Sequence, residues 1–154
     1  MKVTFIGDIH GQVEIVKTAL AKRGRKIFVG DLVDSFTHPP VESRKCMELV
    51  LGAVEAGKAE VIYGNHELSY LFPHHRCSGY TNATYGFMQE LRPRITAAFK
   101  SHIMLAPDFL VTHAGLSKQL WEDQLLNLDV LDHVLCDWWP DISSPAHWIG
   151  YSRG

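Results

Sequence analysis

Four short apolar runs, each followed directly by polar residues, constrain the fold of this chain more than any other feature. The first two runs are Val3–Ile6 and residues 27–29, and the segment between them has apolar residues at helical spacing. The third run, residues 61–63, follows a second helical segment, and the fourth is Phe109–Val111. Strands that alternate with helices favour parallel pairing. The sequence therefore predicts the α/β class, with helices layered on a sheet.

The remaining elements are predicted from periodicity and turn residues. Helices are expected over residues 13–22, 41–56, 85–100, 116–121 and 125–135. Residues 69–85 have poor periodicity and several turn residues, so we expect an irregular surface insertion there. A β-hairpin is expected from residues 102–105 and Phe109–Val111, which Ala106-Pro107-Asp108 separates.

Composition excludes several classes of protein. The chain has 154 residues, which fits one domain over residues 1–154, and a net charge of −2 gives no reason to expect nucleic-acid or membrane binding. No apolar stretch approaches the ~18–20 residues of a membrane span, and the first residues do not resemble a signal peptide. Three scattered cysteines form neither a disulfide framework nor a zinc knuckle, so we expect a reducing, cytoplasmic location.

The polar residues after the four runs are typical of a metal site. Asp8 and His10 are two positions apart, so both side chains can face one ion. Asp31 follows the second run, and its two oxygens can bridge two ions, while Asn65 and His113 follow the third and fourth runs. Carboxyl ends of parallel strands meet at one edge of a sheet, where ligands bind. We expect two divalent ions ~3.5–4 Å apart, with Mn, Fe, Zn or Mg suited to these ligands.

Each motif alone is weak evidence, because most Asp-x-His pairs lie in surface turns, and a histidine such as His113 is more often structural than a ligand. Their common position at strand ends indicates the metal site. His66, next to Asn65, can stay off the ions and protonate a leaving alkoxide, which is typically worth ~10²–10⁴-fold in rate. Asp34 is expected to hold its other nitrogen. With a metal-bound hydroxide as nucleophile, this chemistry would hydrolyse phosphate esters.

These motifs resemble those of the calcineurin-like metallophosphoesterases. Within that family they are most similar to one branch, which contains the PPP-type serine/threonine phosphatases, the bacteriophage lambda protein phosphatase and bacterial diadenosine tetraphosphatases. That branch carries GDxHG, GDxVDRG, GNHE and HGG or HAG, and the chain has GDIHG, GDLVD, GNHE and HAG. The resemblance implies an α/β-β-α sandwich. The implied metal ligands are Asp8, His10 and Asp31 for the first ion, and Asp31, Asn65 and His113 for the second. It also implies His66 as general acid, Asp34 as its orienting carboxylate, and Asn65 near the substrate.

Two departures from the family pattern matter. Ser35 stands where the family has an arginine that grips phosphate bidentately, and we expect Arg153, with Arg76 as an alternative, to bind substrate instead. The family also has one more metal-binding histidine in a late strand. The only late histidine here, His147, lies in a different context. We therefore expect a chain that lacks the C-terminal strands of the sandwich.

Three functions remain open at this point. The first is a dinuclear-metal phosphoesterase, with manganese favoured, that acts on phosphomonoesters in small molecules or phosphorylated proteins. The second is a dinucleoside polyphosphate hydrolase with the same core. The third is a metal-binding remnant with little catalysis that acts through interaction, which Ser35 and the absence of the last metal-binding histidine motivate. A comparison of the turnover of a phosphopeptide with the turnover of diadenosine tetraphosphate distinguishes the first two functions.

Overall fold

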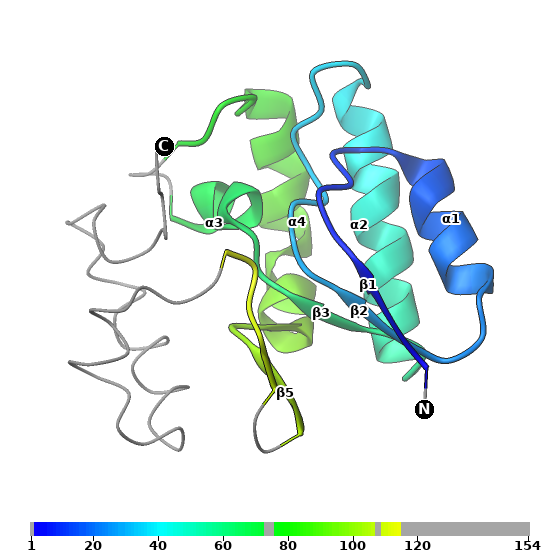
Figure 1. Cartoon of the computed structure of the whole chain (residues 1–154). Helices are drawn as coiled ribbons and strands as arrows, with labels where there is room; N and C mark the ends of the chain where they lie inside the picture. The colour runs from blue at the N-terminus through cyan, green and yellow to red at the C-terminus, as the bar shows by residue number, and fades with distance from the viewer. Residues whose placement is uncertain (1, 73–75, 107–108, 115–154) are drawn as a thin grey trace, which may run out of the picture. The chain divides into compact units, whose positions relative to one another are not determined.

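A four-stranded parallel sheet organises the first part of the chain (Figure 1). The structure is a computed structural model that describes residues 2–72, 76–106 and 109–114. The chain divides into two compact units, residues 1–100 and 101–154, and each is described by itself. The strands of the first unit are β1 (Val3–Ile6), β2 (Arg25–Phe28), β3 (Glu60–Ile62) and β4 (Phe99–Lys100). They lie side by side in chain order, which confirms the α/β class.

The helices that connect these strands are α1 (Val13–Ala21), α2 (Pro40–Glu55), α3 (Asn65–Leu71) and α4 (Asn82–Ala98). Helices α1, α2 and α4 lie on the same side of the sheet (Figure 1). Helix α2 begins with Pro40, where a missing N–H costs no hydrogen bond. Helix α4 begins after Thr81, whose hydroxyl accepts the Thr84 N–H at 3.0 Å. It continues through Pro93, as predicted.

The second unit contains the predicted hairpin. Strands β5 (Ile103–Ala106) and β6 (Phe109–Val111) pair antiparallel, with Ile103 opposite Val111. The helices predicted over residues 116–121 and 125–135 lie outside the described residues. Within the described part of the chain, each helix is too short or too polar to cross a membrane.

The prediction of an irregular surface insertion over residues 69–85 is wrong at both of its ends. Ser69, Tyr70 and Leu71 complete α3, and all three are buried. At the other end α4 begins at Asn82, and Thr84 in its first turn is also buried. The seven-residue α3 has too few residues for its period to stand out in the sequence. The conformation of this segment is determined by its tertiary packing rather than by its local sequence pattern.

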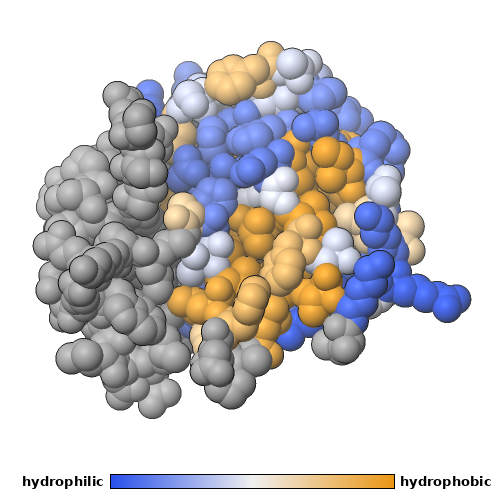
Figure 2. All heavy atoms as spheres, viewed as in Figure 1, coloured by the Kyte–Doolittle hydropathy of each residue, from blue (hydrophilic) through white to orange (hydrophobic). Residues whose placement is uncertain are grey.

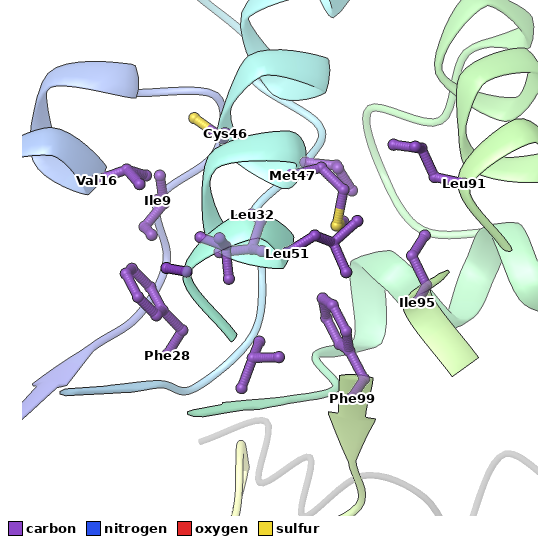
Figure 3. Close-up of a cluster of buried hydrophobic side chains, with 14 of the residues drawn as sticks. Ile9, Val16, Phe28, Leu32, Cys46, Met47, Leu51, Leu91, Ile95 and Phe99 are labelled. Atoms are coloured by element: carbon purple, nitrogen blue, oxygen red, sulfur yellow. The ribbon is translucent and has the colours of Figure 1, made fainter. Parts of the chain in front are cut away.

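The hydrophobic core lies between the sheet and the helices (Figure 3). Its members include Val16 of α1, Met47 and Leu51 of α2, Leu91 and Ile95 of α4, and Phe28 and Phe99 of the strands. Cys46 of α2 belongs to this core, and burial raises the pKa of its thiol to about 12, which excludes it as a nucleophile at neutral pH. Figure 2 shows hydrophobic residues gathered over the strands and hydrophilic residues around their carboxyl ends.

Two glycines let the loops after β2 and β3 touch. Gly30 has a φ of 89°, a left-handed conformation that other residues adopt at a cost. A Cβ on Gly30 would collide with the backbone of Gly64, and a Cβ on Gly64 would lie 2.5 Å from the Asp31 nitrogen. Only glycine at both positions permits this approach of the two loops.

We expect Gly30→Ala to lower the free energy of unfolding by about 2–4 kcal/mol, since it adds backbone strain and a steric collision. Gly52→Ala is the matched control. Gly52 lies inside α2, and a Cβ there meets nothing within 4 Å, so this change should stabilise the protein by ~0.5–1 kcal/mol. Urea unfolding of both variants measures the difference. Equal effects on stability would contradict the close approach of the loops.

Candidate metal centre

Left-handed backbone marks the predicted site. Asp8, His10, Asp31 and Asp34 have φ values of 52°, 46°, 56° and 64°. In the part of the chain that the structure describes, these are the only residues other than glycine with positive φ. Such conformations cost roughly 1–2 kcal/mol each and cluster at functional sites. All four belong to the set that the sequence predicts, so the backbone independently supports the location of the site.

Hydrogen bonds between backbone groups join the loops after β1 and β2. The His10 N–H donates to the Asp31 carbonyl, and the Gly11 N–H donates to the Leu32 carbonyl, both at 2.9 Å. These bonds continue beyond the end of the parallel pairing between the two strands. The motif that carries His10 and the motif that carries Asp31 are therefore held in one register.

Glu67 joins the loop after β2 to the loop after β3. Its side chain is completely buried, and its two oxygens accept three backbone N–H groups. Oε2 accepts from Asp31 at 2.9 Å and from Gly64 at 3.0 Å, while Oε1 accepts from Leu32 at 2.7 Å. Burial and the nearby Asp31 carboxylate raise the pKa of Glu67, and the three donors oppose that rise. Sequence reasoning missed this role, although a glutamate in the first turn of a helix is a known capping signal.

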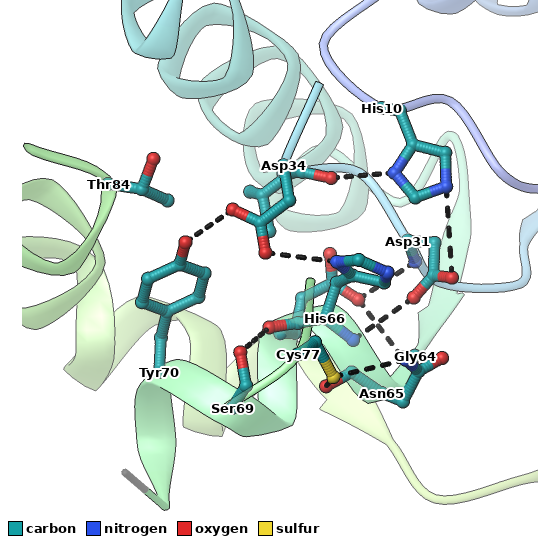
Figure 4. Close-up of polar contacts among 12 residues, drawn as sticks. His10, Asp31, Asp34, Gly64, Asn65, His66, Ser69, Tyr70, Cys77 and Thr84 are labelled. Carbon is teal, nitrogen blue, oxygen red and sulfur yellow. Dashed lines mark hydrogen bonds and ion pairs between the residues drawn. The ribbon is translucent and has the colours of Figure 1, made fainter. Parts of the chain in front are cut away.

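His10 is oriented to offer a lone pair towards Asp31 (Figure 4). Its Nδ1 lies 2.9 Å from the carbonyl oxygen of Val33, and because a carbonyl can only accept, Nδ1 carries the proton. Nε2 is then an acceptor, 4.0 Å from Oδ2 of Asp31. The other Asp31 oxygen, Oδ1, accepts the His66 N–H at 3.2 Å. Two acceptors that face each other at this distance suit a cation between them.

His66 lies between Asp31 and Asp34 (Figure 4). Its Nδ1 is 2.9 Å from Oδ2 of Asp34, which is the contact expected from the sequence, and both side chains are buried. Burial lowers the pKa of His66, but the hydrogen bond to Asp34 and the charge of Asp31 outweigh it, so the pKa is raised. The His66 ring meets the edge of His10, with ring centres 4.9 Å apart.

Two further side chains, which sequence reasoning missed, contact this group. The hydroxyl of Tyr70, on α3, donates to Oδ1 of Asp34. The thiol of Cys77 accepts from the Asn65 amide at 3.2 Å and donates to the Asn65 carbonyl at 3.3 Å. Neither has a motif signal, because each meets its partner only once α3 and the following loop have folded.

Other predicted residues have different surroundings. Asp8 is exposed at the end of β1. His113 is half-buried after β6 in the second unit, and its role as a ligand stays a prediction. Arg153, the candidate for binding phosphate, lies outside the described residues.

The alternative candidate is Arg76, whose guanidinium lies 4.6 Å from the centre of the Tyr80 ring. Ser35 accepts the backbone N–H groups of residues 37 and 38, at 3.2 and 3.0 Å, so its hydroxyl organises its own turn.

The chemistry of these groups fits a divalent metal ion. Within the described residues, His10, Asp31 and His66 bring three possible ligand atoms within 4.8 Å of one another. Imidazole and carboxylate ligands of this kind suit first-row metals and magnesium rather than thiolate-bound metals. A backbone carbonyl fixes the ring of His10, and Glu67 fixes the backbone of Asp31, as is usual around metal ligands.

Comparison with models of known protein families gives a match over most of the chain. A model of the family described as calcineurin-like phosphoesterase matches residues 1–151. This match confirms the family that the motifs resemble, while the narrower branch of that family stays a prediction. The comparison with curated proteins found no match.

We predict that Glu67→Gln lowers the free energy of unfolding by about 2–4 kcal/mol, because its amide group would face backbone donors that then lose their acceptor. Manganese affinity should fall by ~10–100-fold, since the backbone of Asp31 loses its support. Urea unfolding and calorimetric titration with manganese measure the two effects. Glu14→Gln, at an exposed pair with Lys17, is the control and should change stability by less than about 0.5 kcal/mol. A Glu67→Gln variant as stable as this control would show that the Glu67 carboxylate does not hold the two loops together.

Proposed function

The chain belongs to the calcineurin-like phosphoesterases, a family of metal-dependent phosphoester hydrolases, and we propose that it hydrolyses phosphomonoesters. The observation that carries this proposal is the buried His66–Asp34 pair beside the facing acceptor atoms of His10 and Asp31. One half of this arrangement suits a proton donor and the other half suits a cation. Hydrolysis of a phosphomonoester with an alkoxide leaving group benefits from both.

The ligand half is assigned to Asp8, His10 and Asp31 for one ion, and to Asp31, Asn65 and His113 for the other. Divalent ions bound there would neutralise phosphate charge and generate a nucleophile from water at neutral pH. His10 contributes a fixed lone pair because Val33 holds its Nδ1 proton. Asp31 contributes Oδ2, while its Oδ1 is held by the His66 N–H.

The proton-donating half is assigned to His66. Asp34 accepts from its Nδ1, so Nε2 is the nitrogen that would give a proton to the leaving oxygen. That proton prevents the build-up of negative charge on an alkoxide, whose conjugate acid is weak. Asp34 keeps the ring in one orientation and favours its charged form.

The substrate and the metal are the finer parts of the proposal. We favour manganese and a phosphorylated side chain of a protein, because GNHE, HAG and GDLVD together match the protein phosphatase branch. A dinucleoside polyphosphate is the alternative substrate. Arg153 is proposed to replace the arginine missing at Ser35, and Arg76 is the alternative. The same metal and acid residues could act on either substrate, so the residues that line the surrounding pocket would decide which substrate is hydrolysed.

Hydrolysis of p-nitrophenyl phosphate by metal-stripped protein, titrated with manganese, tests the proposed function. We expect saturable activity at two bound ions per chain, with metal content measured on the same samples. Metal binding without turnover would support the third possibility, a metal-binding remnant that acts through interaction, and the absence of both would contradict the proposed metal site. A parallel assay with a phosphoserine peptide and diadenosine tetraphosphate assigns the substrate class.

Two variants distinguish the role of metal ligand from the role of general acid. His66→Asn should keep its manganese and lose ~10²–10³-fold in kcat, since it removes an interaction made mainly in the transition state. Asp31→Asn should weaken binding of both ions, because its carboxylate is proposed to be shared. Metal analysis after gel filtration, with steady-state kinetics, measures both effects. Loss of metal from the His66 variant would show that His66 is a ligand and not the acid.

A further inference from the structure

We propose that Tyr70 is a positioning residue for the proton-donating histidine, acting through Asp34. The inference rests on the proposed function, because it concerns how His66 is held for proton transfer. Three buried side chains form one chain of hydrogen bonds, from the Tyr70 hydroxyl through the two oxygens of Asp34 to Nδ1 of His66 (Figure 4). Tyr70 has no exposed surface and Asp34 only 3%.

The direction of these hydrogen bonds follows from the chemistry of the groups. The backbone N–H of Thr81 lies 3.1 Å from the Tyr70 oxygen and can only donate. The hydroxyl proton of Tyr70 therefore points at Oδ1 of Asp34. The two oxygens of Asp34 both accept, one from the Tyr70 hydroxyl and the other from the His66 imidazole. This double contact prevents rotation of the carboxylate.

The ring of Tyr70 has supports that do not need the hydroxyl. It stacks on Tyr80, with ring centres 4.5 Å apart and planes at 14°. The Tyr70 carbonyl accepts from Gln89 of α4 at 2.8 Å. Removing the oxygen alone should therefore leave the ring in place and free the Asp34 carboxylate to turn. The hydroxyl itself stays protonated, because burial and Asp34 raise its pKa.

Substrates with different leaving groups distinguish this role from a general structural one. p-Nitrophenolate leaves with little help from an acid, whereas phenolate needs a proton more. In manganese-loaded protein we expect Tyr70→Phe to lower kcat for phenyl phosphate by ~10-fold and kcat for p-nitrophenyl phosphate by less than ~2-fold, with unchanged metal content. Equal losses on both substrates, or none, would overturn the proposal.

A double-mutant cycle tests the path through Asp34. If Tyr70 acts through that carboxylate, Tyr70→Phe should have no further effect on phenyl phosphate turnover in an Asp34→Asn background. Effects that multiply would overturn the proposal. Tyr85→Phe is the matched control, since Tyr85 is 37% exposed on α4 and should lose less than ~1.5-fold on either substrate.

Proton NMR gives a readout that does not depend on turnover. In metal-free protein the Nδ1 proton of His66, identified by its loss in His66→Asn, should be shifted downfield and exchange slowly. It should broaden or move upfield in Tyr70→Phe and persist in Tyr85→Phe. An unchanged signal in Tyr70→Phe would overturn the proposal even if the wild-type chain releases no phosphate. In the wild type the buried Tyr70 hydroxyl proton should itself exchange slowly, and fast exchange would also count against the proposal.

Discussion

The rest of the site depends on one buried carboxylate, that of Glu67. It accepts backbone N–H groups from the loop after β2, at residues 35 and 36 positions before it in the chain, and from the loop after β3, and so joins the two loops. Gly30 and Gly64 permit the contact, because any Cβ there would separate the loops. Buried donors without an acceptor are costly, so this arrangement resists distortion. The positions of Asp31, Asn65 and His66 depend on this contact, because all three residues lie in or next to the two joined loops.

From this point the polar groups extend in two directions with different chemistry. Towards β1, His10 and Asp31 present acceptor atoms that face each other at 4.0 Å, and their left-handed backbone is held by hydrogen bonds between the loops. Towards α4, His66, Asp34 and Tyr70 form a chain of donors and acceptors that satisfy one another. The first group suits a cation and the second suits a proton. The two groups adjoin where the His66 N–H meets Asp31, so under the proposed function both would act on one phosphate group.

The first three strands of the sheet and the motifs at their ends could be predicted from the sequence because both depend on local pattern, whereas β4 (Phe99–Lys100) lies inside a segment predicted to be helical. Val3–Ile6 forms a strand as predicted, although Ile6 is its only buried residue, and Asp8, Asp31 and Asn65 follow their strands within a few residues. The contacts of Tyr70 and Cys77 could not be predicted in this way, since they depend on how α3 and α4 pack. Glu67 lies inside a recognised motif, yet two of its three backbone donors, Asp31 and Leu32, come from a distant loop. The expected contact between Asp34 and His66 is present because their spacing from the strand ends is short.

Diffraction at the manganese absorption edge, from crystals grown with manganese, would show which side chains bind the ions. We expect two anomalous peaks at the carboxyl edge of the sheet, one of them against both Nε2 of His10 and Oδ2 of Asp31. We also expect His66 to stay off both ions, with Nδ1 on Asp34. A peak bonded to His66, or none near Asp31, would contradict the division between ligand and acid on which the proposed mechanism rests.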